Sequence, residues 1–282
     1  MKDKSVLITG CSSGIGLCVA EGLKNRGYQV FATARQEKDV QLLKEKGFDD
    51  ALQLDLDDTD SITTALEAVL KKTGGHLFAL FNNGAYGQAG AVEDLSRETL
   101  RKNFETNVFG THELTCLVTP VMRKQGYGRI IQNSSVLGLI SLPYRGAYNA
   151  SKYALESLTD TLRLELHDTN IKISLIEPGP ISSKFRANAF ASYKRNIDKE
   201  NSFHKQKYEA MERRLTKQGP AAPFTLPPDA VLKKVIHALE NPKPQIRYYV
   251  TFPTYLFGAL RRILPGSWLD AVLKKISKGE QK

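Results

Sequence analysis

Tyr148 and Lys152 are the residues whose types and spacing most clearly suggest chemistry in this sequence. They lie four positions apart, so both side chains share one face of a helix. A tyrosine with its ordinary pKa near 10 exchanges protons poorly at neutral pH, and a lysine ammonium nearby lowers that pKa. Ser135 lies upstream, directly after an apolar run typical of a strand. In open α/β sheets ligands bind at strand carboxyl ends, so these residues predict a site of proton transfer.

A glycine-rich turn provides a second candidate site. The sequence Thr9-Gly10-Cys11-Ser12-Ser13-Gly14-Ile15-Gly16 follows the first apolar run and precedes a helical pattern. Glycines permit left-handed backbone and close approach of a diphosphate, while the N-terminus of the next helix offers unpaired N–H groups. The spacing differs from that of many dinucleotide-binding turns. Its place between strand and helix nevertheless predicts a dinucleotide site.

The end of the second expected strand indicates which dinucleotide binds. A site for NAD usually has an acidic residue there, which bonds the ribose 2′-hydroxyl. Here the sequence is Ala32-Thr33-Ala34-Arg35, without an acid. Arg35 can form charge-assisted bonds to a 2′-phosphate, with Ser13 as a second contact, which favours NADP(H). The alternative is that Arg35 is a solvated surface charge.

Alternating strand and helix patterns must position these residues. Helix-length segments with apolar residues three and four apart separate the strands, and such alternation predicts a doubly wound parallel sheet with helices on both faces, a Rossmann fold. Pro228 is expected to start a helix at Asp229–Leu239. The seven expected strands are Ser5–Thr9, Tyr28–Thr33, Ala51–Leu56, Leu77–Phe81, Arg129–Asn133, Lys172–Ile176 and Gln245–Val250.

We interpret residues 1–282 as one domain, whose cofactor-binding and catalytic core comprises residues 1–183 and 227–250. Residues 184–226 are basic and carry scattered aromatic residues, so we expect a substrate lid; a disordered insertion is the alternative. Residues 251–282 suit two amphipathic helices separated by Pro265-Gly266. One interpretation of this extension is peripheral contact with an anionic membrane. The other is closure of the substrate pocket or packing against a subunit.

Taken together, these motifs resemble the short-chain dehydrogenase/reductase (SDR) superfamily over nearly the whole chain. More narrowly, Thr9–Gly16, Ala147–Glu156 and 177–181 resemble bacterial NADP-dependent aldehyde reductases, which are related to 17β-hydroxysteroid and retinol dehydrogenases. Two departures stand out: Asn82-Asn83-Gly84-Ala85 inverts the usual final Ala-Gly, and Ser183 replaces a frequent threonine. Both keep small or hydroxyl-bearing residues, so we expect function to be retained.

The resemblance implies a role for each matching residue. Tyr148 would be the acid/base, Lys152 would lower its pKa and hold the nicotinamide ribose, and Ser135 would bond the substrate oxygen. Asn107 would position a water that relays protons to Lys152. Asp55 would contact the adenine and Asn83 the adenosine ribose. The expected cofactor-binding set is Gly10, Ser12, Ser13, Gly14, Ile15, Gly16, Arg35, Asp55, Asn83, Gly84, Tyr148, Lys152, Pro178, Gly179, Ile181 and Ser183.

The segment after Ser135 is expected to meet the substrate. Leu137, Gly138, Ile140, Leu142, Pro143 and Tyr144 are mostly apolar, which favours a lipophilic aldehyde or ketone. Arg145 could meet an anionic group or remain a surface charge, and His204 shows no partner and is expected to be solvated. A steroid- or retinol-type alcohol dehydrogenase is one alternative function. A non-catalytic NADPH sensor is another.

Composition limits the remaining classes. Three scattered cysteines predict neither a disulfide framework nor a metal site, and they favour a reducing compartment. No secretory signal or membrane-length apolar run is evident, so we expect a cytoplasmic protein. The net charge of +10 comes from the lid and C-terminal segments without any nucleic-acid recognition motif. Family members commonly pair through helices near residues 104–125 and 147–168, which implies a homodimer or homotetramer.

Overall fold

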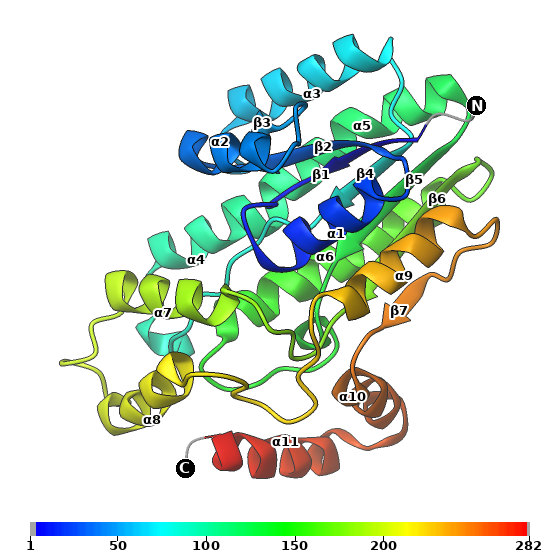
Figure 1. Ribbon diagram of the computed structural model, residues 1–282. Coiled ribbons are helices and arrows are strands. Elements are labelled where there is room, and N and C mark those ends of the chain that lie inside the picture. Colours follow the sequence, from blue (N-terminus) through cyan, green and yellow to red (C-terminus); the bar gives the residue numbers. More distant parts are fainter. Residues whose placement is uncertain (1–3, 281–282) are drawn as a thin grey trace.

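A twisted parallel sheet forms the centre of the molecule in a computed structural model that describes residues 4–280 (Figure 1). Within those residues the sheet has seven strands in the order β3-β2-β1-β4-β5-β6-β7, which confirms the predicted Rossmann fold. The expected strand Ala51–Leu56 shortens to two residues, because a turn at Asp55–Asp58 leads the chain into α3. The strands are β1 Ser5–Ile8, β2 Gln29–Ala34, β3 Leu52–Gln53, β4 Ala79–Asn82, β5 Gly128–Asn133, β6 Ile171–Glu177 and β7 Arg247–Tyr249.

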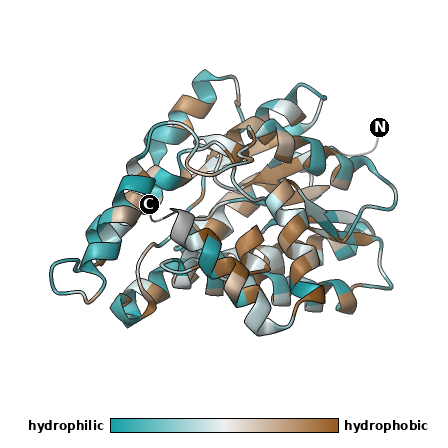
Figure 2. Ribbon diagram, turned by 90° about the horizontal axis from the view of Figure 1, so that it is seen from below, coloured by the Kyte–Doolittle hydropathy of each residue, from teal (hydrophilic) through white to brown (hydrophobic). Residues whose placement is uncertain are grey.

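Helices cover both faces of the sheet (Figures 1 and 2). One apolar core lies between the sheet and α1, α2 and α9, and a second lies between the sheet and α3, α5 and α6. Helix α9 begins at the predicted residue. The helices are α1 Gly14–Lys24, α2 Glu37–Glu45, α3 Thr59–Thr73, α4 Arg97–Phe104, α5 Thr111–Gln125, α6 Gly146–Glu165, α7 Phe185–Asn196, α8 Lys205–Thr216, α9 Asp229–Glu240, α10 Phe252–Ile263 and α11 Gly266–Glu280.

The expected lid segment is helical. It contains α7 and α8, which pack on each other beside the carboxyl end of the sheet (Figure 1). Tyr193 and Tyr208 are the large buried side chains of their shared core. The Tyr208 hydroxyl accepts a hydrogen bond from the backbone N–H of Ala91 at 2.9 Å and donates one to Asp94. These contacts attach the lid to the segment that follows β4.

The two C-terminal helices lie together along the lower edge of the molecule in Figure 1, as the break at Pro265-Gly266 predicted. Their inner faces form a small apolar core with the segment after Ser135, in which Phe257 and Leu273 are buried. No helix within residues 4–280 is both long enough and apolar enough to span a membrane.

Candidate active site

A cavity of about 620 Å³ opens at the carboxyl end of the sheet. Its walls come from the glycine turn, the segments after β4, β5 and β6, helix α6 and the lid. Most sequence-predicted site residues line it, namely Gly10, Ser12, Ser13, Gly14, Ile15, Asn83, Gly84, Ser135, Tyr148, Lys152, Pro178, Gly179, Ile181 and Ser183. Gly16, Arg35, Asp55 and Asn107 are not among its lining residues.

The glycine turn is shaped to leave space beside α1. Gly10 and Gly14 have φ angles of +72° and +61°, which other residues rarely adopt. A Cβ on Gly16 would lie 2.2 Å from the carbonyl oxygen of Gly10. Ser13 precedes α1 without a side-chain cap, so the first N–H groups of the helix face the cavity region unpaired by a capping side chain. An anionic group fits this turn.

The segment after β4 supports the turn from behind. The amide nitrogen of Asn83 donates to the carbonyl oxygens of Thr9 and Gly10 at 3.0 and 3.2 Å. The backbone N–H of Gly84 donates to the Thr9 hydroxyl at 2.8 Å. A Cβ built on Gly10 would lie 2.9 Å from the Cα of Gly84. Gly84, the glycine of the inverted Gly84-Ala85 pair, therefore lies where the segment after β4 approaches the glycine turn most closely.

Arg35 and Asp55 lie beyond the cavity, at the same edge of the sheet. Arg35 follows β2 and is exposed, and Asp55 follows the neighbouring β3. Asp55 accepts a hydrogen bond from the backbone N–H of Asp57 at 3.1 Å. Parallel pairing of Ala34 with Gln53 brings the two segments together. Both residues therefore follow the carboxyl ends of neighbouring strands and lie close to each other.

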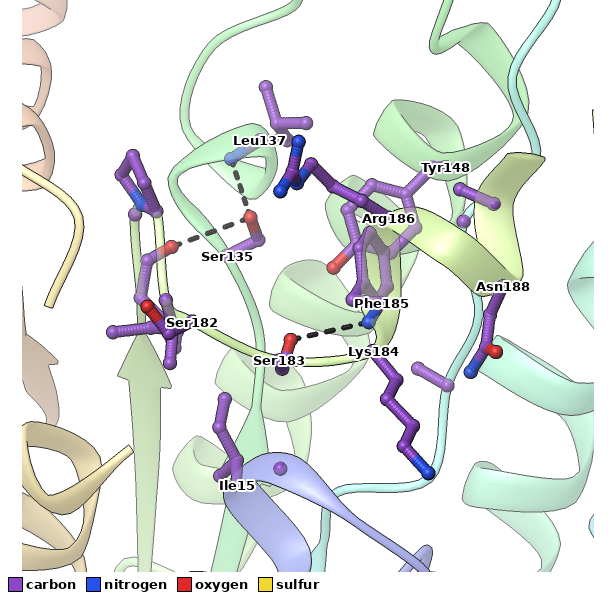
Figure 3. A pocket seen from close by; sticks show the side chains of 18 of the residues that line it. Ile15, Ser135, Leu137, Tyr148, Ser182, Ser183, Lys184, Phe185, Arg186 and Asn188 are labelled. Atoms are coloured by element: carbon purple, nitrogen blue, oxygen red, sulfur yellow. Dashed lines mark hydrogen bonds between the residues drawn. The ribbon is translucent and has the colours of Figure 1, made fainter. Parts of the chain in front are cut away.

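Tyr148, Ser135 and Lys152 are brought together by α6 and the end of β5. All three are buried, and the Lys152 ammonium nitrogen lies 5.6 Å from the centre of the Tyr148 ring. That nitrogen donates to the carbonyl oxygen of Asn133 at 2.7 Å. The Ser135 hydroxyl accepts from the N–H of Leu137 at 3.1 Å (Figure 3). The Tyr148 phenol, the Lys152 ammonium and the Ser135 hydroxyl therefore border the same cavity.

Burial shifts the pKa values of Tyr148 and Lys152 in opposite directions, because it disfavours the charged form of each side chain. It raises the pKa of Tyr148 above its ordinary value, and a hydrogen bond with Ser135 offsets this only in part. Burial thus outweighs any lowering of this pKa by the Lys152 ammonium, so the net decrease expected from the sequence is not found. Burial also lowers the pKa of Lys152 to about 8, against the opposing charge of Glu156. At neutral pH Tyr148 keeps its proton.

Asn107 lies in a π-helical turn, Glu105–Gly110, between α4 and α5. Such turns often occur at functional sites. Its amide nitrogen donates to the carbonyl oxygen of Tyr86 at 2.9 Å and to the Ser151 hydroxyl at 3.1 Å. Its side-chain oxygen accepts from the N–H of Tyr86 at 3.0 Å. The side chain fastens the segment after β4 to α6 behind Tyr148.

Phe185, at the start of α7, is a site residue that the sequence analysis missed. Its ring meets the Tyr148 ring edge-on, with centroids 5.2 Å apart (Figure 3). Arg186 and Arg214 also line the cavity, and Arg186 donates to the carbonyl oxygens of Arg214 and Gly219. Because the position of the lid is set by tertiary packing, no local pattern could identify these residues.

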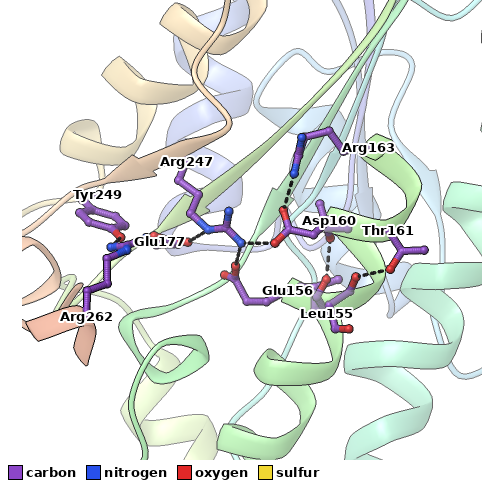
Figure 4. Close-up of polar contacts among 11 residues, drawn as sticks. Leu155, Glu156, Asp160, Thr161, Arg163, Glu177, Arg247, Tyr249 and Arg262 are labelled. Atoms are coloured by element: carbon purple, nitrogen blue, oxygen red, sulfur yellow. Dashed lines mark hydrogen bonds and ion pairs between the residues drawn. The ribbon is translucent and has the colours of Figure 1, made fainter. Parts of the chain in front are cut away.

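A partly buried ionic cluster next to the site was also missed (Figure 4). Arg247 of β7 contacts Glu156 at 3.0 Å, Asp160 at 2.5 Å and Glu177 at 3.1 Å. Burial and the neighbouring Glu156 raise the pKa of Glu177 to about 9. Glu156 lies one helical turn beyond Lys152. The cluster therefore places a negative charge below the candidate catalytic lysine.

Two expectations for the substrate side need correction. His204 is not solvated: its Nε2 lies 2.5 Å from Glu93, its Nδ1 lies 3.3 Å from the Tyr144 hydroxyl, and its side chain is 17% exposed. These partners are distant in sequence and could not be seen there. Of the segment after Ser135, Leu137 and Leu142 line the cavity, as does Arg145. Ile140 instead packs against α10 and α11, and Tyr144 packs against the lid.

Comparison with known proteins gives the family. A family model described as short chain dehydrogenase matches residues 4–194. The uncharacterized oxidoreductase YbbO of Escherichia coli is 44% identical, with 96% of this chain and 94% of that protein covered. Human 17-beta-hydroxysteroid dehydrogenase type 1 is 34% identical over 87% of this chain and 77% of its own.

A solved structure agrees with this result. A short-chain dehydrogenase from Streptomyces avermitilis superposes with a TM-score of 0.76 at 26% identity, covering 99% of this chain and 98% of that one. The match extends through the lid and the C-terminal helices. The chain belongs to the short-chain dehydrogenase family of oxidoreductases.

Proposed function

We propose that this protein is an NADP(H)-dependent reductase of lipophilic aldehydes, and also of ketones. The observation that carries the proposal is the cavity itself, which Ser135, Tyr148 and Lys152 line together with the glycine turn. In this proposal residues 1–183 and 227–250 bind the cofactor and carry the chemistry. Residues 184–226 cover the substrate.

A dinucleotide fits the residues present. The left-handed glycines and the uncapped N-terminus of α1 suit a diphosphate, and Ser12, Ser13 and Ile15 line the same wall. Asp55 would contact the adenine and Asn83 the ribose beside it. Pro178, Gly179, Ile181 and Ser183 would border the nicotinamide. Arg35, exposed at the end of β2 where no acid stands, would bind a 2′-phosphate and so select NADP(H).

In the proposed reaction, residues of the cavity would supply the proton that the substrate oxygen needs. A bound NADPH supplies a hydride to the carbonyl carbon of the substrate. Tyr148, which is protonated at neutral pH, donates its proton to the carbonyl oxygen as negative charge develops there. Ser135 donates a hydrogen bond to the same oxygen. Lys152 holds the ribose, and its ammonium stabilises the phenolate that Tyr148 becomes; a water held at Asn107 would return the proton from solvent.

The cavity wall supports a lipophilic substrate. Apolar side chains line the cavity at Val136, Leu137, Leu142, Phe185 and Leu215, and arginines line it at Arg145, Arg186 and Arg214. Apolar walls with few polar groups are typical of sites for hydrophobic molecules. Similarity to the human steroid dehydrogenase favours a second candidate, oxidoreduction of a larger steroid- or retinol-type alcohol.

The cofactor part of the proposal is tested with Arg35→Ala. Loss of a bidentate contact to the 2′-phosphate should weaken NADPH binding by about tenfold or more and leave NADH binding unchanged, since a charge-assisted bond contributes about 1.5–3 kcal/mol. Titration of each cofactor by fluorescence measures both dissociation constants. Lys38→Ala, on the adjoining helix, is the matched control. Equal weakening for NADPH and NADH would refute the role of Arg35.

The substrate class is tested by NADPH oxidation with medium-chain aldehydes, ketones, sterols and retinal. Highest kcat/KM for aldehydes supports the first candidate, and highest kcat/KM for sterols or retinal supports the second. NADPH binding without turnover of any of these compounds would favour an NADPH-sensing protein and contradict both.

A further inference from the structure

The outer face of α10 carries a row of exposed apolar side chains. Phe252, Tyr255, Leu256 and Ile263 are between 38% and 75% exposed. Their spacing of three, four and seven residues places them on one side of the helix. The opposite side holds the buried Thr254, Phe257 and Gly258. Helix α10 therefore has two apolar faces, and only the inner one is covered in the described residues.

This row continues toward the mouth of the cavity. The ring of Phe224, which is 57% exposed, lies 4.9 Å from the ring of Phe252. Phe224 has a φ angle of +58°, an unfavourable conformation for this residue type, so its surroundings hold it in place. The adjacent Ala222 and Thr225 line the cavity. Trp268, at the start of α11, is a further exposed aromatic residue.

Cations border the row of apolar residues. Between residues 252 and 277 the chain has Arg261, Arg262, Lys274 and Lys275 against a single acid, Asp270. Arg262 is exposed and donates to the hydroxyl of Tyr249, whose ring lies 5.4 Å from that of Tyr255. On α11, Lys275 lies two turns after Trp268 and is also exposed. Exposed aromatic and aliphatic residues bordered by cations are typical of interfacial membrane helices.

We propose that the docking face, defined as Phe224, Phe252, Tyr255, Leu256, Ile263 and Trp268, binds an anionic lipid surface. A second copy of the chain is the rival occupant. A two-fold contact would bring each patch against itself, so that the cations around Arg262 and Lys275 would face one another. An anionic lipid surface instead pairs with them. Because Phe224 lies between Ala222 and Thr225, which line the cavity, a lipophilic substrate could pass from the lipid to the site. This last step rests on the proposed function, whereas docking does not.

Vesicle flotation tests the docking face on the full-length protein. We expect co-flotation with vesicles of phosphatidylcholine and phosphatidylserine, and reduced binding to pure phosphatidylcholine or at raised salt. The double variant Ile263→Ser, Trp268→Ser should bind at least about tenfold more weakly, because it loses two apolar side chains that would enter the interface. Leu42→Ser, at an exposed leucine of α2 on another side of the molecule, is the matched control.

Three results would overturn the proposal. The parent protein could fail to float with the anionic vesicles, or the double variant could float as well as the parent. Alternatively, sedimentation could show that the double variant, but not Leu42→Ser, loses a dimer, which would assign the face to a second copy. Reduction of a short, water-soluble aldehyde is measured on the same proteins. Absence of this activity would count against the proposed function only, whereas flotation alone tests the docking face.

Discussion

At the level of single residues, burial raises the pKa of Tyr148 and lowers that of Lys152. The pKa of the tyrosine is raised, so it starts as the proton donor that a carbonyl reduction needs. The pKa of the lysine is lowered to about 8, so its charge is lost only just above neutral pH. Glu156 opposes that loss, and Arg247 in turn holds Glu156. The ionic cluster therefore adjusts the site electrostatically without touching the substrate.

The pH dependence of the proposed reaction follows from this arrangement. As pH rises through about 8, Lys152 loses its proton, and kcat/KM should fall. Glu156→Gln removes the charge that raises the lysine pKa, so the alkaline fall should move to lower pH. Profiles of kcat/KM against pH measure the shift. Glu165→Gln, exposed at the end of the same helix, should leave the profile in place; an unmoved profile in Glu156→Gln would refute this role.

Among the structural elements, those whose conformation is fixed by local sequence could be predicted. The glycine turn, β1 and the helix after Pro228 were predictable because residue type and neighbours fix their conformation. The ionic cluster was not, since Arg247 and Glu156 are 91 positions apart. Phe185 reaches Tyr148 only because Tyr193 and Tyr208 pack the lid in place. Such residues are set by tertiary packing, which periodicity does not encode.

The first βα turn gives a test at this scale. In Gly16→Ala the new Cβ would meet the carbonyl oxygen of Gly10, so the turn must move away from α1. We expect a loss of about 1–3 kcal/mol in the free energy of unfolding and weaker NADPH binding. Denaturant unfolding and cofactor titration measure the two effects. Gly266→Ala, where a Cβ would meet no atom within 4 Å, is the control, and equal stability of both variants would contradict this description of the turn.

At the scale of the whole molecule, α5 and α6 carry exposed apolar side chains that the monomer does not cover. Phe109 and Leu117 lie in or before α5, and Leu158 and Leu164 lie on α6, with exposures of 38–61%. These elements fall in the ranges expected to pair subunits. We therefore expect a homodimer or homotetramer to form through them, on a surface separate from the docking face.

A charge at this surface should weaken association. Leu158→Glu would place two like charges at a two-fold contact and shift the protein toward monomer. Sedimentation velocity at several concentrations measures the change in mass, and Leu42→Glu provides the control. A parent protein that is monomeric throughout, or a variant with unchanged mass, would contradict the predicted interface.

The most direct measurement compares the parent protein with Tyr148→Phe during NADPH oxidation by a lipophilic aldehyde. Phenylalanine keeps the ring against Phe185 but has no proton to donate. We predict that kcat falls by about 10²–10⁴-fold while the NADPH dissociation constant stays the same. Turnover preserved in Tyr148→Phe, or a parent protein that binds NADPH and reduces no aldehyde or ketone, would contradict it.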